Sequence, residues 1–255
     1  MNPKRKGRAH VARKGKNPER REINPAVTRL SAATPFAITE AYKIVRTNLL
    51  YSLASSKSKV VLMSSALPNE GKSTTCANLA ITMAQTGAKV VIVDADMRKP
   101  VLHKIFRVSN NNGLSKLLSG LIKPEDCINK SIMPNLDLIN AGPIPPNPSE
   151  LLGSERMAGL LQTLSASYDY IFLDAPPINV VADSLMFLDK TAGAILVARQ
   201  KQTHYDELQK AAESIRNLHS SVLGVVITDV SETNKPYAMY KSYKYKSYDY
   251  EYKKV

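Results

Sequence analysis

The chain of 255 residues carries 35 Lys and Arg against 22 Asp and Glu, a formal net charge of +13, and 44% of its residues are hydrophobic. That apolar fraction excludes a wholly disordered chain, and the length allows a sizeable core in one α/β domain or two small ones. No apolar run approaches the roughly 20 residues that span a bilayer, and the basic N-terminus lacks the apolar stretch of a secretory signal. Cys76 and Cys127 are too few for a disulfide framework or a metal cluster, which favours a reducing compartment.

The positive charge is concentrated at the two ends of the chain. Residues 1–29 hold ten Lys or Arg and two Glu, a net charge of +8, while residues 30–234 carry +1 and residues 235–255 carry +4. The first segment has few large apolar residues to offset its ordering entropy, so we expect a basic, disordered N-terminal arm over residues 1–34. Two uses of this arm stay open: a solubilising extension, or an electrostatic contact with an anionic membrane surface or nucleic acid.

Residues 35–234 alternate helical patterns with short apolar runs. This predicts one α/β domain built on a doubly wound, mostly parallel sheet. The apolar runs place strands at 59–64, 90–93, 136–139, 170–173, 194–197 and 223–227. Helical spacing places a leading helix at 38–53 and further helices at 72–86, at 149–164 with Ser149 as its N-cap, near 183–189 and at 204–218.

A phosphate-binding loop follows the first predicted strand. Residues 66–73, Ala-Leu-Pro-Asn-Glu-Gly-Lys-Ser, fit the P-loop pattern except that Ala66 replaces the first glycine. Backbone N–H groups at the start of the next helix favour phosphate oxygens, Lys72 can reach the β- and γ-phosphates, and Ser73 places a hydroxyl where Mg²⁺ would sit. The residues expected to bind ATP are Asn69, Glu70, Gly71, Lys72, Ser73, Thr74 and Thr75.

Three acidic residues lie at the ends of two other predicted strands. Asp94 and Asp96 follow the strand at 90–93, and Asp174 follows the strand at 170–173. A carboxylate at such a strand end, beside the P-loop, can hold Mg²⁺ or its waters, as the Walker-B aspartate does in P-loop NTPases. The plainer alternative, that such a residue only caps the following turn, does not account for all three.

The C-terminal segment 235–255 is a flexible tyrosine cluster by composition. Seven of the chain's twelve tyrosines fall within it: Tyr237, Tyr240, Tyr243, Tyr245, Tyr248, Tyr250 and Tyr252. Lysines are interleaved with them, so the tail could stack single-stranded nucleic acid. Exposed clustered tyrosines are equally suited to accept phosphate, and the choice depends on the chemistry of the core.

Taken together, these motifs resemble the bacterial tyrosine kinases of capsule and exopolysaccharide systems, over about residues 35–255. The resemblance is to their split form, in which a P-loop kinase pairs with a separate transmembrane activator. It rests on the terminal tyrosines and on four motifs, at residues 64–75, 91–98, 142–152 and 171–177.

This resemblance implies an ATP-dependent protein-tyrosine kinase that uses Mg²⁺ and regulates polysaccharide synthesis and export. Lys72 would neutralise the transferring phosphate, while Ser73, Asp94 and Asp174 would hold Mg²⁺. Asp96 would orient the incoming tyrosine hydroxyl or take its proton. The tail tyrosines would be phosphorylated in trans, and other tyrosine-bearing proteins are possible substrates.

The resemblance also implies a ring-shaped homo-oligomer at the inner face of the cell membrane, held there by the activator. A ring motif, Glu-x-x-Arg-x-x-Arg, falls on Glu40, Lys43 and Arg46 of the leading helix, with Lys43 in place of the first arginine. Without the resemblance, these three residues would be a solvated helix face. A second departure is Thr228, which stands where relatives usually place Asn near the adenine.

Three other functions compete with a kinase. Partition- and septum-type ATPases share the expected fold, but they carry an extra lysine early in the P-loop where this chain has Leu67, and they lack a tyrosine tail. Iron–sulfur carrier ATPases of the same superfamily need paired cysteines, which Cys76 and Cys127 do not provide. A nucleic-acid-binding module could use both basic ends, but the core contains no reading motif, which argues against nucleic acid as a partner.

Overall fold

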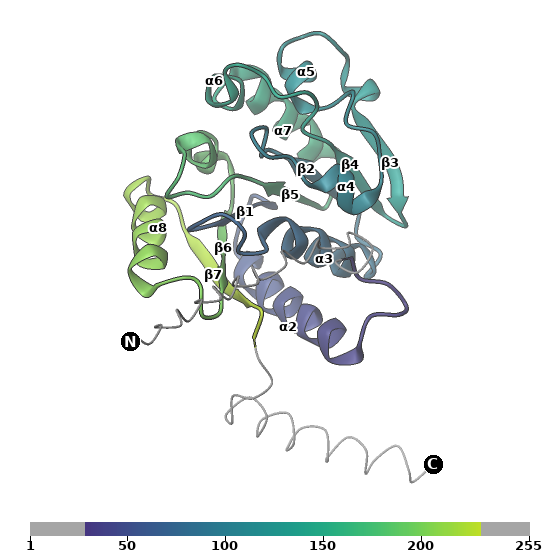
Figure 1. Ribbon diagram of the computed structural model, residues 1–255. Helices are drawn as coiled ribbons and strands as arrows, with labels where there is room; N and C mark the ends of the chain where they lie inside the picture. The colour runs from purple at the N-terminus through teal and green to yellow at the C-terminus, as the bar shows by residue number, and fades with distance from the viewer. Residues whose placement is uncertain (1–28, 231–255) are drawn as a thin grey trace, which may run out of the picture.

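The computed structural model describes residues 29–230; most of the predicted basic arm and the whole tyrosine cluster lie outside the described residues. The chain forms a seven-stranded sheet in the order β3-β4-β2-β5-β1-β6-β7, with helices on both of its faces (Figure 1). Its strands are β1 Val60–Ser65, β2 Val90–Asp94, β3 Ile128–Met133, β4 Leu136–Ile139, β5 Tyr170–Asp174, β6 Gly193–Arg199 and β7 Val222–Thr228. All neighbours pair in parallel except β3 with β4. The predicted doubly wound, mostly parallel α/β fold is confirmed.

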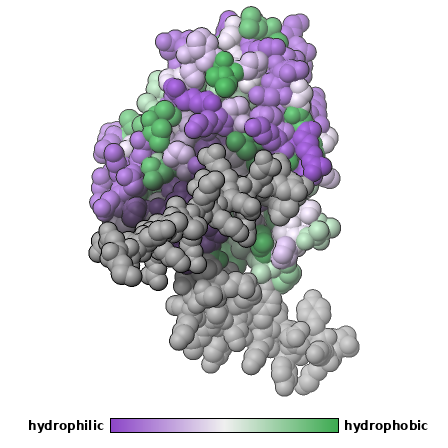
Figure 2. Space-filling model, viewed as in Figure 1, coloured by the Kyte–Doolittle hydropathy of each residue, from purple (hydrophilic) through white to green (hydrophobic). Residues whose placement is uncertain are grey.

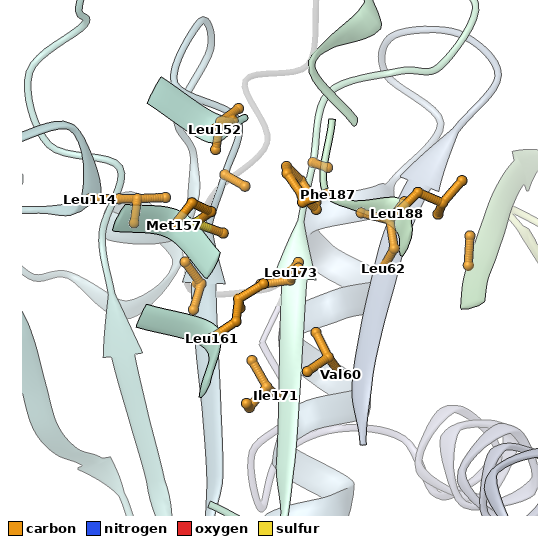
Figure 3. Packing of buried hydrophobic residues seen from close by; sticks show 14 of the residues in the cluster. Val60, Leu62, Leu114, Leu152, Met157, Leu161, Ile171, Leu173, Phe187 and Leu188 are labelled. Atoms are coloured by element: carbon orange, nitrogen blue, oxygen red, sulfur yellow. The ribbon is translucent and has the colours of Figure 1, made fainter. Parts of the chain in front are cut away.

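Helices cover the sheet because its central strands β1, β2 and β5 are apolar and buried on both sides. They are α2 Phe36–Leu53, α3 Lys72–Ala84, α4 Leu102–Phe106, α5 Leu114–Leu118, α6 Pro148–Leu152, α7 Glu155–Ser167 and α8 Tyr205–Asn217, with 3-10 turns η1 Pro124–Asp126, η2 Ala182–Leu185 and η3 Leu188–Lys190. Successive β1 side chains enter different clusters: Val61 and Met63 pack with α2, α3 and α4, whereas Val60 and Leu62 pack with residues of α5 to α8. Figure 3 shows Leu62 in the cluster that contains residues of α5 to α8.

The molecular surface is largely hydrophilic where the described residues can be seen in Figure 2, with hydrophobic side chains in small, separate patches. Among residues 29–230, no helix is long and apolar enough to cross a membrane.

Two local predictions were wrong, and some elements were not predicted. The helix expected at 149–164 is two helices, because the helical conformation is interrupted at Gly153 and Ser154. Ser154, not Ser149, is the N-cap of α7 and accepts a hydrogen bond from the Met157 N–H. The helix expected near 183–189 is the pair of short turns η2 and η3. Strand β3 and the short helices α4 and α5 were not predicted.

The first two described residues, Arg29 and Leu30, pack on the domain. Leu30 is buried, and its N–H donates to Asn78 Oδ1 on α3 at 2.9 Å. The Arg29 guanidinium lies 5.8 Å from the centre of the Phe106 ring on α4. Helix α2 begins at Phe36, two residues before the predicted start.

Candidate active site

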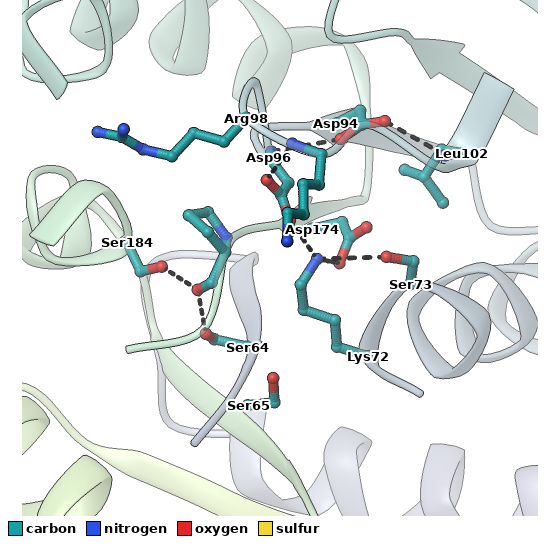
Figure 4. A network of polar contacts seen from close by, with 12 residues as sticks. Ser64, Ser65, Lys72, Ser73, Asp94, Asp96, Arg98, Leu102, Asp174 and Ser184 are labelled. Carbon is teal, nitrogen blue, oxygen red and sulfur yellow. Dashed lines mark hydrogen bonds and ion pairs between the residues drawn. The ribbon is translucent and has the colours of Figure 1, made fainter. Parts of the chain in front are cut away.

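The candidate site lies where β2, β5 and β1 end, side by side in the centre of the sheet. Asp94, the last residue of β2, is opposite Asp174, the last residue of β5. Strand β1 leads into the P-loop, which ends at the start of α3. The sheet therefore brings together Lys72, Ser73, Asp94, Asp96 and Asp174, residues from three separate sequence motifs (Figure 4).

The P-loop turns sharply into α3 through two residues with positive φ. Asn69 has φ 66° and Gly71 has φ 91°, and Gly71 is the N-cap of α3. Glycine enters this left-handed region without steric cost, so it suits the turn that points backbone N–H groups towards a phosphate. Ala66, which replaces the first glycine of the pattern, is fully buried and packs in the core. The substitution is therefore accommodated within the fold.

Lys72 joins the carboxylates of the site. Its Nζ lies 2.9 Å from Asp96 Oδ2 and 3.4 Å from Asp174 Oδ1. Burial by itself would lower the pKa of Lys72, but the charges of Asp174 and Asp96 outweigh burial and hold this pKa above its ordinary value. The surroundings of Lys72 therefore favour its charged form, which can pair with a further negative group.

Asp94 and Asp96 have different surroundings although they are two residues apart. Asp94 is fully buried and accepts backbone N–H bonds from Leu102 and from Asp96, each at 3.3 Å. Burial and the neighbouring Asp174 raise the pKa of Asp94 well above its ordinary value. Asp96 faces Lys72 with one oxygen and accepts the Lys99 N–H with the other, at 3.0 Å. The two carboxylates are thus suited to different tasks.

The donor set fits a hard divalent cation such as Mg²⁺. Asp174 is fully buried, and its Oδ2 has no hydrogen-bond partner among the described residues. Burial also raises the pKa of Asp174 in spite of Lys72, and a nearby cation would relieve that cost. Within residues 29–230, no group of three His, Cys, Asp or Glu could hold a metal by itself. A magnesium ion here would need water and phosphate oxygens as further ligands, which is its usual preference.

A second set of contacts braces the P-loop from β6 and β7, and sequence reasoning missed it. The buried Glu70 carboxylate accepts the Leu67 N–H at 2.9 Å and the Thr203 hydroxyl. The Thr228 hydroxyl donates to the Glu70 carbonyl oxygen at 2.7 Å. Arg199 contacts the Asn69 carbonyl oxygen at 3.4 Å. The local hint in the sequence was Glu70 itself, an acidic residue inside a loop expected to bind phosphate; its distant partners gave none.

Removing the brace at Thr228 should weaken nucleotide binding. Thr228→Val keeps the side-chain shape but leaves the buried Glu70 carbonyl without its donor, a loss of about 1 kcal/mol that corresponds to roughly fivefold weaker binding. Titration with a fluorescent ATP analogue measures the effect. Thr163→Val, which removes a hydroxyl that bonds to the Gly159 carbonyl within α7, is the matched control. Equal affinity in the two variants would contradict a bracing role.

The three residues of the ring motif lie on α2, away from the P-loop. Lys43 Nζ pairs with Glu40 Oε1 at 2.7 Å within the helix. Arg46 donates to the Thr82 carbonyl oxygen on α3 at 2.8 Å. The described contacts of all three are thus made within the chain, and Arg46 attaches α2 to the helix that begins at the P-loop.

The fold and the site define a P-loop nucleotide-binding protein, and a family model described as an AAA domain matches residues 58–222. The tyrosine-protein kinase YwqD of Bacillus subtilis is 39% identical over 189 residues, which are 74% of this chain and 80% of that relative. The chain belongs to the family of bacterial tyrosine-protein kinases, as the motifs of the sequence indicated.

Solved structures agree with this assignment. The crystal structure of the chimerical protein CapA2B2 matches with a TM-score of 0.72 and 39% identity, over 76% of this chain and 85% of that one. The kinase domain of Escherichia coli tyrosine kinase ETK matches with a TM-score of 0.72 and 31% identity, over 76% and 77%. The septum site-determining protein MinD of Pyrococcus horikoshii, at 21% identity and a TM-score of 0.59, over 69% of this chain and 72% of that one, shares the fold alone.

Proposed function

We propose that this chain is an ATP-dependent protein-tyrosine kinase that phosphorylates the C-terminal tyrosine cluster of another copy of itself. One observation carries the proposal: Lys72 of the P-loop lies between Asp96 and Asp174, 2.9 and 3.4 Å from their oxygens. The site therefore combines a phosphate-neutralising cation with a carboxylate that can orient a hydroxyl. The seven tyrosines between residues 237 and 252 supply acceptors, and the related kinases support this reaction class.

In the proposed reaction, a tyrosine oxygen attacks the γ-phosphorus, the bond to the β–γ bridging oxygen breaks, and ADP leaves. Backbone N–H groups of Asn69 to Thr75 cradle the phosphates, and Lys72 neutralises the charge on the transferring group. Asp96 accepts the phenol proton. Mg²⁺, held by Ser73, Asp94 and Asp174, would neutralise the charge of the phosphate oxygens.

Lys72 has two competing partners in this scheme. It pairs with Asp96 in the structure, and the γ-phosphate carries more negative charge than that carboxylate. Arrival of the nucleotide would therefore draw Lys72 to the phosphate and leave Asp96 free to accept a proton. The Lys72–Asp96 ion pair would then keep both groups in place until ATP is bound.

The wider proposal concerns partners and domains. A kinase domain of residues 35–234 would lie between the basic arm and the tyrosine tail. It would regulate capsule or exopolysaccharide synthesis, bound through a transmembrane activator at the inner membrane face. Copies would assemble in a ring through Glu40, Lys43 and Arg46, and the arm would contact anionic lipid rather than nucleic acid.

Two matched variants test whether the reaction occurs and whether one copy phosphorylates the tail of another. One has all seven tail tyrosines replaced by Phe and keeps its catalytic groups; the other is Lys72→Met and keeps its tail. Each is incubated alone and together with MgATP, and phosphotyrosine is mapped by mass spectrometry. We expect phosphate on the Lys72→Met tail only in the mixture. Wild-type protein that binds MgATP but forms no phosphotyrosine would contradict the proposed function.

A further inference from the structure

Arg98 and Asp183 form an ion pair beside the candidate active site that the proposed reaction does not use. Arg98 Nε donates to Asp183 Oδ2 at 2.7 Å and Arg98 Nη2 donates to Asp183 Oδ1 at 3.0 Å, the two-pronged geometry in which Arg binds a carboxylate most firmly. Ser149 Oγ adds a third hydrogen bond, to Asp183 Oδ1 at 2.6 Å. The Asp183 side chain is only 1% exposed. A buried carboxylate with three donors is a rigid anchor.

The contacts of Asp183 join three segments that are distant in the sequence. Arg98 lies in the loop after β2, Ser149 is in the first turn of α6 after the proline-rich residues 143–147, and Asp183 is in η2 after β5. The next residue, Ser184, donates to the Pro176 carbonyl oxygen, which also accepts the Ser64 hydroxyl of β1. Asp183 is thus fixed to the central strands. Hydrogen bonds from Arg98 and Ser149 hold the pKa of Asp183 below its ordinary value although burial opposes them.

Arg98 is two residues from Asp96, on a segment that forms neither helix nor strand. Residues 95–101 connect β2 to α4. Within residues 29–230, the side-chain oxygens of Asp96 contact Lys72 and the backbone N–H of residue 99. Buried Met97 fixes one side of this segment in the core. In Figure 4 the Arg98 side chain runs the other way, away from Lys72 and towards the segment that carries Ser184.

We propose that Arg98, Asp183 and Ser149 form a clamp whose role is to position Asp96 for the reaction. The inference rests on the proposed function. When ATP binds in that scheme, Lys72 pairs with the phosphate instead of Asp96, so Asp96 needs another support. The clamp keeps the 95–101 segment against η2 at that moment. Its three members are positioning residues, since they reach the reaction only through Asp96. The motif at residues 142–152 acquires a role in this way, through the hydroxyl of Ser149.

Kinetics of conservative variants distinguish a positioning clamp from an ordinary structural ion pair. Arg98→Lys keeps the charge but loses the planar guanidinium group that binds both oxygens of Asp183. We expect kcat for tail phosphorylation to fall about 10- to 100-fold, with KM for ATP almost unchanged. Ser149→Ala should lower kcat about 3- to 10-fold, and Ser149→Thr, which keeps the hydroxyl, should restore it. The control is Asp189→Asn, which removes an exposed ion pair with Lys190 in η3. Thermal unfolding confirms that each variant is folded.

Two results would overturn the clamp: kcat unchanged in both Arg98→Lys and Ser149→Ala, or a rise in KM for ATP that accounts for the whole loss. Failure of the proposed function is recognised separately, because wild-type protein would then form no phosphotyrosine. In that case the clamp is tested by the rate of MgATP hydrolysis in the same proteins. Asp96 would then orient a water molecule in place of a phenol. A parallel fall in hydrolysis supports the clamp, and unchanged hydrolysis rejects it.

Discussion

Lys72→Met is expected to lower the rate of tail phosphorylation by about 10²–10³-fold, the usual cost of removing one group that stabilises transition-state charge. The substitution deletes the only side-chain cation that the structure places within 4 Å of both Asp96 and Asp174 among residues 29–230. Negative charge on the transferring phosphate would then face Asp96 and Asp174 without the Lys72 charge between them. Single-turnover measurement with radiolabelled ATP gives the rate directly.

Lys72→Arg is the matched control for charge. It keeps a cation but replaces a point charge with a larger planar fork, so its rate should lie between those of wild type and Lys72→Met. Lys72→Met should also unfold at lower temperature, because removing one partner leaves buried Asp174 unpaired. Rates are therefore compared at a temperature where all three proteins are folded. A Lys72→Met rate within about tenfold of wild type would contradict the role given to Lys72.

The central sheet and the phosphate loop could be predicted because their signals are local. Strands such as β1 are buried on both faces, so burial appears in the sequence as an unbroken apolar run. Strand β3 gives no such run: it lies at the sheet edge, pairs antiparallel with β4 and alternates irregularly, with Ser131 at φ 53°. The helical spacing at 149–164 continues across Gly153 and Ser154, so apolar periodicity alone could not reveal the break between α6 and α7.

The candidate site could be predicted only in part, for a similar reason. A P-loop and aspartates at strand ends are recognisable within a few residues of sequence. The residues that hold them are distant: Thr203 lies 133 positions from Glu70, and Asp183 lies 85 positions from Arg98. Thr228 was singled out as a departure near the adenine, and in the structure its hydroxyl bonds to the Glu70 carbonyl. Long-range polar contacts of this kind leave no pattern in a single sequence.

Asp96→Asn and Asp94→Asn should both impair the kinase, but in different ways. Asp96→Asn can still accept the Lys99 N–H through its amide oxygen, yet it cannot take a proton. We expect kcat to fall about 10²–10³-fold, as for loss of a general base, with the Mg²⁺ requirement unchanged. Asp94 is fully buried beside Asp174. Asp94→Asn should instead raise the Mg²⁺ concentration for half-maximal activity by about tenfold or more, as changes around a metal site do.

Magnesium titrations at fixed ATP, with phosphotyrosine as the readout, separate the two roles. Asp189→Asn, in an exposed ion pair on η3, should match wild type in both parameters. If Asp96→Asn shifts the Mg²⁺ midpoint as far as Asp94→Asn does, Asp96 belongs to the metal site and another group must take the proton. If neither midpoint moves, Asp94 acts only through its hydrogen bonds to the backbone N–H groups of residues 96 and 102. The different surroundings of the two carboxylates favour the division: Asp96 is the one that pairs with Lys72, and therefore the one that a bound phosphate would set free.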